Sequence, residues 1–250
     1  MKHLSFDIEI ADQFDLRPGE DLLKYAPFHI SVAATVEAEG DARLWYTDGA
    51  GGNPALTMDR NKAQELLAFL ADRQKQGLRL FAWNGLGFDL RWIGHNAQDM
   101  ETAAGVALNL YDPMFQFFNQ RGFPVGLAAV AQAMGVQQTK LMDSADAPRE
   151  WNQGRYQRVM EYVTGDCQIT NQVVAAIARE KRVSWRTKKG TLSYEPMPRF
   201  KTVAEVLKDP EPDQSWMAPG GGMRRSKFTE WLPPAVVRQF TSSPPQSRKP

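Results

Sequence analysis

The sequence predicts an α/β fold in which a mixed, five-stranded sheet is flanked by helices. Residues 3–10 alternate between apolar and polar side chains, which is the period of a β-strand. Residues 60–76 repeat their apolar side chains at helical spacing. Beyond them, short apolar runs alternate with further helical patterns, as in βαβ units. A chain of 250 residues suits one such catalytic domain with an extension.

Five segments of the first half have the composition of strands. The first three are close enough in sequence to form a meander, and the later two are expected to join the sheet as parallel strands. Gly, Asn and Pro mark residues 48–54 as a loop, and Gly77 is a plausible helix C-cap. In order, the predicted elements are strands 3–10, 28–37 and 42–47, helix 60–76, strand 78–83, helix 88–99 and strand 106–112.

Helical patterns dominate the second half as far as residue 182. A short helix is predicted at 126–134, residues 138–153 are expected to be irregular, and a long helix is predicted from about 155 to 182. Pro and Gly become frequent after this point. We therefore expect a domain at 1–182 and a basic, Pro/Gly-rich extension at 183–250.

The expected extension differs from the domain in charge. Residues 1–182 carry 18 Lys and Arg against 23 Asp and Glu, a net charge of −5, whereas residues 183–250 carry 12 against 6, a net charge of +6. An acidic body beside a basic segment fits a carboxylate metal site next to a phosphate-binding surface, but a solvated basic tail explains the charge equally well. Within the extension, residues 230–240 are candidates to pack on the body, and 241–250 are expected to be disordered.

Several classes of protein do not fit the composition. The chain has no run of about 18 apolar residues that would span a membrane, and its first residues lack the pattern of a signal peptide. The single Cys167 excludes an intramolecular disulfide and a cysteine-based zinc site, and His3, His29 and His95 lack zinc-ligand spacing. A cytoplasmic location is therefore expected.

Asp7 and Glu9 lie two residues apart on the first predicted strand, so both side chains point to one face. Adjacent carboxylates repel each other, and their burial is costly unless a cation neutralises them. The opposite face of this strand is apolar, which places it inside the sheet. The pair therefore indicates an oxygen-ligand site for Mg²⁺ or Mn²⁺, although an edge strand with acidic outer residues has the same pattern.

The segment from Asn84 to Asp89 follows a predicted buried strand, and its glycines permit a tight turn. Phe88 is expected to anchor Asp89 at the start of a helix, at the edge of the sheet where α/β proteins build their sites. An aspartate at this position is also a common helix N-cap. Asn84 and Phe88 are candidate substrate contacts, although turn capping and core packing explain them equally well.

Tyr162 and Asp166 are four residues apart in the long predicted helix and share one of its faces. A phenol and a carboxylate in this arrangement are able to share a water molecule. In isolation, an ordinary amphipathic pair explains these two residues more simply.

Taken together and in this order, the three segments resemble the DEDD superfamily of exonucleases. The histidine branch of that superfamily expects His at the position of Glu161, so the resemblance is to the tyrosine branch, which includes the proofreading domains of family B DNA polymerases. The resemblance covers about residues 3–178 and implies a ribonuclease H-like fold. The matching segments are Asp7-Ile8-Glu9 for D-I-E, Asn84 through Phe88-Asp89 for N-x-x-x-[F/Y]-D, and Tyr162 through Asp166 for Y-x-x-x-D.

The resemblance implies 3′→5′ hydrolysis of nucleic acid with two Mg²⁺ or Mn²⁺ ions and release of nucleoside 5′-monophosphates. Two cations about 4 Å apart stabilise both the attacking and the leaving oxygen. It also implies that Asp7 bridges the ions, that Glu9 and Asp166 complete the site on the nucleophile side, and that Asp89 holds the second ion largely through waters. Tyr162 would orient the attacking water, because a phenol with a pKa of about 10 is protonated at pH 7. Asp112 and Asp143 match no motif and are left outside this site.

The expected partner is the 3′ end of a single strand, DNA rather than RNA. Two runs, 185–189 and 223–228, combine cations with aromatic side chains, which suits single-stranded nucleic acid, although a solvated basic surface explains each run at least as well. An RNA-trimming exonuclease, a non-catalytic nucleic-acid-binding module and an endonuclease on the same fold are the alternatives.

Overall fold

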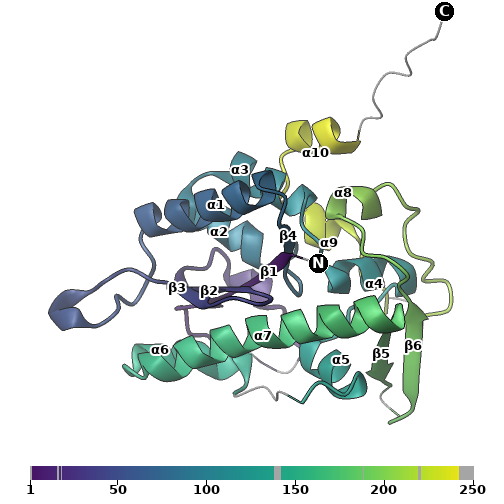
Figure 1. Cartoon of the computed structure of the whole chain (residues 1–250), viewed down its shortest axis with the longest axis horizontal. Coiled ribbons are helices and arrows are strands. Elements are labelled where there is room, and N and C mark those ends of the chain that lie inside the picture. Colours follow the sequence, from purple (N-terminus) through teal and green to yellow (C-terminus); the bar gives the residue numbers. More distant parts are fainter. Residues whose placement is uncertain are drawn as a thin grey trace, which may run out of the picture.

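The centre of the molecule is a four-stranded mixed sheet with the strand order β3-β2-β1-β4 (Figure 1). The computed structural model describes residues 2–15, 17, 19–137, 142–187, 189–218 and 221–241. Strand β1 (His3–Ile10) pairs with antiparallel β2 (Ile30–Glu37) and with parallel β4 (Arg79–Phe81). Strand β2 also pairs with antiparallel β3 (Ala42–Trp45). The predicted mixed sheet is therefore confirmed, with β1 inside it.

The prediction of a fifth strand at 106–112 is wrong. Its first residues complete helix α3 (Met100–Leu108), and Tyr111 makes only an isolated parallel bridge to Phe81. A short apolar run does not distinguish a strand from a buried helix, and here the run is buried as part of α3. Asp112 then caps helix α4 (Pro113–Arg121), whose first residue is proline. Pro at the first helical position favours a new helix, so the chain leaves the sheet after a single bridge.

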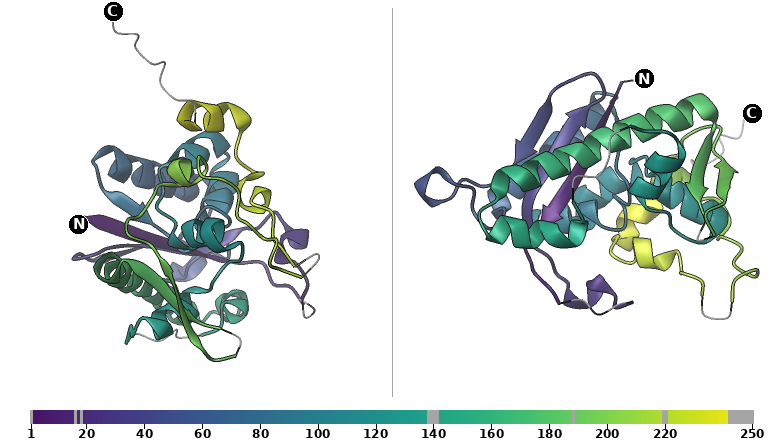
Figure 2. Two further views of the ribbon diagram at one scale, coloured as in Figure 1. Left: turned by 90° about the vertical axis from the view of Figure 1, so that its right-hand side faces the viewer. Right: turned by 90° about the horizontal axis from the view of Figure 1, so that it is seen from below.

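Helices cover both faces of the sheet. Helices α1 (Arg60–Lys75), α2 (Asp89–Ala97) and α3 lie on one face (Figure 1), and α6 (Ala147–Asn152) and α7 (Tyr156–Glu180) lie on the other (Figure 2, right). Leu4, Phe6 and Ile8 of β1 belong to the core that includes α1, α2 and α3. Because successive side chains of a strand point to opposite faces, the odd-numbered residues of β1 are directed toward α7.

Polar contacts fix α7 on the sheet. Ser5 Oγ of β1 donates to Asn171 Oδ1, and Asn171 Nδ2 donates to the carbonyl oxygen of Val36 at 3.1 Å. All three residues are buried, so the bonds satisfy polar groups that burial would otherwise penalise. The same helix packs through apolar side chains on β2. The position of α7 along β1 is thus determined by both packing and hydrogen bonds.

The C-terminal part of the chain packs against the rest of the molecule. A hairpin of β5 (Arg182–Arg186) and β6 (Leu192–Pro196), which the sequence did not predict, lies beside α5 (Leu127–Ala133). Helices α8 (Val203–Val206), α9 (Ser226–Thr229) and α10 (Pro234–Thr241) follow. Leu232 and Val236 join the main core, so the predicted packing of 230–240 on the body is confirmed. Residues 242–250, most of the segment expected to be disordered, lie outside the described residues.

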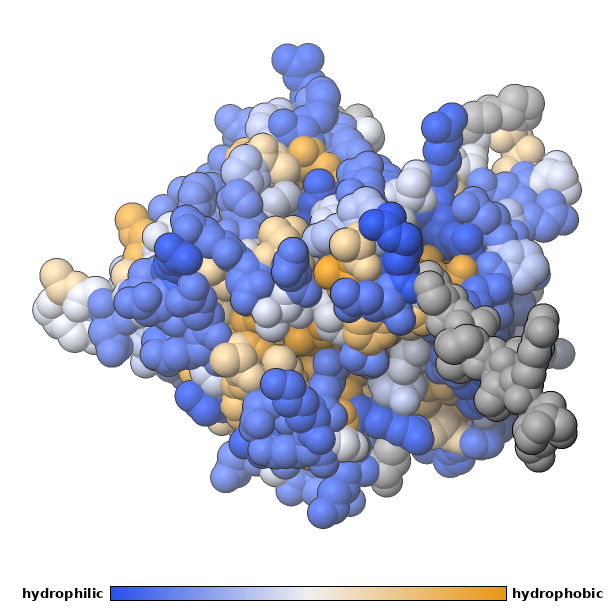
Figure 3. Space-filling model, turned by 90° about the horizontal axis from the view of Figure 1, so that it is seen from above, coloured by the Kyte–Doolittle hydropathy of each residue, from blue (hydrophilic) through white to orange (hydrophobic). Residues whose placement is uncertain are grey.

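The upper face of the molecule is predominantly hydrophilic, with small apolar patches between polar side chains (Figure 3). Within the described part of the chain, none of the helices combines the length and hydrophobicity that a bilayer span requires.

Candidate active site

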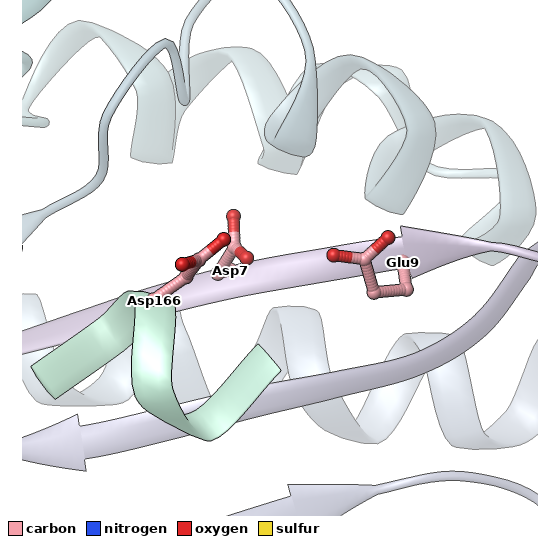
Figure 4. A group of neighbouring side chains, drawn as sticks. All are labelled: Asp7, Glu9 and Asp166. Atoms are coloured by element: carbon pink, nitrogen blue, oxygen red, sulfur yellow. The ribbon is translucent and has the colours of Figure 1, made fainter. Parts of the chain in front are cut away.

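Three carboxylates from two elements form one acidic cluster. Asp7 and Glu9 project from β1, and Asp166 projects from the facing turn of α7 (Figure 4). One oxygen atom of each lies within 4.8 Å of the others. Glu9 and Asp166 are buried, and Asp7 is half-buried. Hard carboxylate oxygens at this separation suit a divalent cation such as Mg²⁺ or Mn²⁺, which would neutralise charges that repel one another.

Asp89 joins this cluster from the other side of β1. It is the first residue of α2, and its Oδ1 accepts a hydrogen bond from the backbone N–H of Ile8 at 3.2 Å. Ile8 lies between the two acidic residues of the strand, so the bond ties the start of α2 to the acidic segment of β1. Burial raises the pKa of Asp89 to about 7, and the charge of Asp112 adds to the rise against the opposing hydrogen bonds.

The turn before Asp89 has a strained but well-supported backbone. Asn84 has a φ of 71°, in the left-handed region that Asn adopts more readily than most residues. The backbone N–H of Phe88 donates to the carbonyl oxygen of Asn84 at 2.9 Å, which closes the turn. Among the described residues, Asn84 Oδ1 is buried and has no hydrogen-bond partner. That oxygen is available to a ligand donor.

Asp112 stabilises the same turn by hydrogen bonds to its backbone. Its carboxylate accepts backbone hydrogen bonds from Asn84 at 3.2 Å, Leu86 at 3.1 Å and Phe115 at 3.0 Å. Burial raises the pKa of Asp112 to about 6 despite these bonds. Its role was missed from the sequence. The Asp-Pro pair predicts a helix start, but nothing in the pattern indicates that the carboxylate also reaches the Asn84–Leu86 backbone.

Tyr162 lies one helical turn before Asp166 on α7 and is almost fully buried. Burial, followed by the charges of Glu9 and Asp166, raises the pKa of Tyr162 above its ordinary value. The side chain therefore remains a neutral phenol at physiological pH. Such a group donates a hydrogen bond and cannot act as a base.

All seven residues predicted for the site line one cavity of about 790 Å³. Asn84 and Phe88 lie on its wall together with the acidic residues and Tyr162. Arg149, Phe14 and Leu22 also line it, and sequence reasoning did not identify them. These residues belong to no sequence motif: Leu22 begins the short helix η1 (Leu22–Tyr25), Arg149 belongs to α6, and Phe14 lies in a connecting segment. The cavity thus joins a cluster of carboxylates to aromatic and aliphatic walls.

The other candidate residues lie elsewhere. Asp143 caps the short helix η3 (Ser144–Asp146) and does not line the cavity. Trp185 of the first basic run is buried against Phe117 and Phe123, so it is not available to stack on a base. Lys188 lies outside the described residues. In the second run, Met223, Lys227 and Phe228 line a neighbouring cavity.

Comparison with known proteins gives a family match. Residues 45–178 match the family model described as RNase_H superfamily, and no curated protein matches the chain. Among solved structures, the family B DNA polymerase from the hyperthermophilic archaeon Pyrobaculum calidifontis is similar at 17% sequence identity and a TM-score of 0.47. The similar region covers 72% of this chain and only 24% of the polymerase chain.

Proposed function

This chain belongs to the RNase H superfamily, and from that premise we propose that it is a 3′→5′ exonuclease that uses two divalent cations. Superfamily membership itself supports a nuclease-like function and a nucleic acid as the substrate. The polarity, the mechanism and the preference for single-stranded DNA are the proposed refinements. We also propose that residues 1–182 form the nuclease domain and that 183–250 form its extension.

The observation that carries the proposal is the convergence of all seven predicted residues on one cavity. Three motifs far apart in the sequence meet there, and the carboxylate oxygens of Asp7, Glu9 and Asp166 come within 4.8 Å of one another. Taken singly, each motif also has an ordinary structural explanation. Their convergence supports the interpretation as one catalytic site.

The donor set fits divalent cations, because it consists of hard oxygen ligands. When bound, two cations supply Lewis-acid stabilisation of the attacking and leaving oxygens of a phosphodiester. From the resemblance to the DEDD exonucleases, Asp7 is proposed to be the carboxylate that would serve both ions. Glu9 and Asp166 would hold the ion on the nucleophile side, and Asp89 would hold the other.

The remaining residues position the reactants. Tyr162 is a neutral phenol, so it is proposed to orient the attacking water by a hydrogen bond. Phe88 and Phe14 offer apolar surface to the terminal nucleotide, and Asn84 Oδ1 offers an acceptor. Attack on the 3′-terminal phosphodiester then releases a nucleoside 5′-monophosphate. Aromatic walls favour unstacked bases, which supports a single strand over a duplex.

One panel of substrates tests the proposal. Single-stranded DNA, duplex DNA and RNA, each labelled at the 5′ or the 3′ end, are incubated with Mg²⁺, Mn²⁺ or EDTA. We expect a 3′-labelled single strand of DNA to release labelled mononucleotide first, and a 5′-labelled strand to shorten stepwise. Asp7→Ala and Asp166→Ala should lose this activity by about three orders of magnitude, because Lewis-acid stabilisation is worth several kcal/mol and each 1.36 kcal/mol is tenfold.

Asp143→Asn is the matched control, because Asp143 is an exposed acid outside the cavity and asparagine retains its capping oxygen. Cleavage of circular single-stranded DNA would contradict the proposal and indicate an endonuclease, because an exonuclease needs a free end. Binding without cleavage in either metal would replace it with a non-catalytic module. Trimming of RNA alone would move the substrate to RNA and leave the mechanism in place.

A further inference from the structure

A second cavity, of about 400 Å³, adjoins the one that holds the acidic cluster. Four residues line both cavities: Leu22, Trp83, Asn84 and Phe88. The two cavities are therefore neighbours, and the Asn84–Phe88 turn forms part of the wall of both. The first is rich in carboxylates. The second contains no acidic residue among its described lining residues and a single cation, Lys227.

The C-terminal segment builds one wall of this second cavity. Met223, Lys227 and Phe228 line it, and the last two belong to α9. Phe228 is buried and packs against the rings of Phe115 and Phe118 of α4. Trp231 Nε1 donates to the carbonyl oxygen of Leu86 at 2.8 Å. The wall is thus anchored directly on the turn that precedes Asp89.

The surroundings of Gly87 show how closely this wall approaches the turn. A Cβ atom at Gly87 would lie 2.8 Å from Cδ1 of Phe228 and 2.5 Å from Oδ1 of Asn84, both too short for a carbon contact. A glycine at this position therefore leaves room both for the Asn84 side chain of the turn itself and for the Phe228 ring of the C-terminal segment. The C-terminal segment is therefore closely packed against the turn and forms part of the wall of the cleft.

Lys227 connects this wall to the opposite side of the cleft. Its Nζ lies 2.7 Å from Oδ2 of Asp21, the residue that caps the short helix η1 (Leu22–Tyr25). The two side chains are 39% and 46% exposed, and an exposed ion pair contributes about 0–1 kcal/mol. A phosphate at the mouth of the cavity can therefore compete with Asp21 for Lys227.

We propose that this second cavity is the subsite for the nucleotide that precedes the 3′-terminal one. Its base lies against the apolar wall of Trp83, Met114 and Phe228, and Lys227 exchanges Asp21 for the phosphate on its 5′ side. The argument rests on the proposed function, because the metal site determines which nucleotide is terminal. It assigns a role in substrate binding to the C-terminal segment.

Two substitutions that break the same ion pair are expected to act in opposite directions. Lys227→Gln removes the cation, and we expect the Kd for a single-stranded DNA oligonucleotide to rise about tenfold, as for the loss of one hydrogen bond to a charged group. Asp21→Asn keeps the helix cap but frees Lys227, so the Kd should fall about threefold, in line with a weak exposed pair. If the pair only fastened the segment, both variants would weaken binding alike.

The Kd is measured by fluorescence anisotropy in EDTA, so that the result does not depend on cleavage. The salt dependence is recorded with it, and Lys227→Gln should lower the slope of log Kd against log salt by about one phosphate contact. Lys24→Gln is the control, because Lys24 is a neighbouring exposed cation that lines neither cavity. A rise in Kd for Asp21→Asn, or no change for Lys227→Gln, would overturn the subsite.

A minimal substrate separates this inference from the proposed function. The p-nitrophenyl ester of thymidine 5′-monophosphate carries a terminal nucleotide and no preceding one. We expect Lys227→Gln to hydrolyse it as wild type does, while its KM for an oligonucleotide rises. Equal impairment on both substrates would place Lys227 at the terminal nucleotide and refute the assignment. Failure of wild type to hydrolyse either substrate would refute the exonuclease, while the Kd comparison would still test the subsite.

Discussion

Two buried aspartates flank the turn between β4 and α2, and their surroundings differ sharply. Asp112 and Asp89 are each only 2% exposed. The Asp112 carboxylate accepts hydrogen bonds from the backbone of Asn84, Leu86 and Phe115. Asp89 accepts hydrogen bonds from the backbone N–H groups of Ile8 and of Asp89 itself, and its side chain also hydrogen-bonds with that of Asp7 in the acidic cluster.

This difference bears on the proposal that Asp89, and not Asp112, is a metal ligand. The protein itself supplies donors to Asp112, so its carboxylate is stabilised as part of the fold. Burial raises the pKa of both carboxyls, to about 7 for Asp89 and about 6 for Asp112, and the charge of Asp112 adds to the rise at Asp89. Burial alone therefore does not identify a metal ligand. The number of donors that the fold directs at the carboxylate is the more informative property.

The largest expected effect is a difference between the two aspartates in how much their substitution lowers the stability of the fold. Asp112→Ala leaves three backbone N–H groups without their carboxylate, and each buried donor without a partner costs about 1–3 kcal/mol. We expect the free energy of unfolding to fall by more than about 3 kcal/mol, measured by urea titration in EDTA at pH 7. Asp89→Ala leaves the backbone N–H of Ile8 without its acceptor, but it also removes the repulsion between Asp89 and Asp112, so the loss should be about 1 kcal/mol or less. Equal losses would remove the distinction.

A smaller effect separates them by their response to metal. At ten times its Kd, Mg²⁺ should raise the free energy of unfolding of the wild type by about 1.4 kcal/mol at pH 8. Asp112→Ala should keep this increment, because Asp112 does not line the cavity that holds the acidic cluster. Asp7→Ala, which removes a carboxylate of that cluster, should lose most of it. If Asp112→Ala lost the Mg²⁺-induced increase in the free energy of unfolding, the Asn84–Phe88 turn would have to be part of the metal site.

Local patterns were sufficient to predict the sheet and the acidic residues. The period of two in residues 3–10 gave both the strand and the shared face of Asp7 and Glu9, and the period of α7 gave the face of Tyr162 and Asp166. The run at 106–112 was misassigned because its length and composition suit either a strand or the end of a buried helix. The predicted RNase H-like fold is confirmed by the family match, while the strand count is not.

Local sequence patterns could not predict the long-range contacts. Val183 and Trp185 belong to the first strand of the β5–β6 hairpin. From the sequence they were assigned to the start of a basic tail, yet both are buried beside α5 and α7. The approach of Phe228 to Gly87 joins segments that no local pattern connects. The hydrogen bonds of Asp112 to the Asn84–Leu86 backbone are of the same kind. Such contacts depend on how elements meet in space, and one sequence contains no period or spacing that reports them.

The smallest expected effect concerns protons released when metal binds. Because burial raises the pKa of Asp89 to about 7 in the metal-free protein, this carboxyl favours its protonated form below pH 7 and must ionise to face a cation. The Mg²⁺ affinity should therefore increase by about twofold from pH 7 to pH 8 and by about tenfold from pH 6 to pH 8, as expected for one titrating group. Calorimetry in two buffers of different ionisation enthalpy should detect about half a proton released per protein at pH 7. Asp89→Asn should remove both the proton release and the pH dependence of the Mg²⁺ affinity, whereas Asp112→Asn should retain both. If Asp112→Asn removed them and Asp89→Asn did not, the roles assigned to the two acids would be reversed.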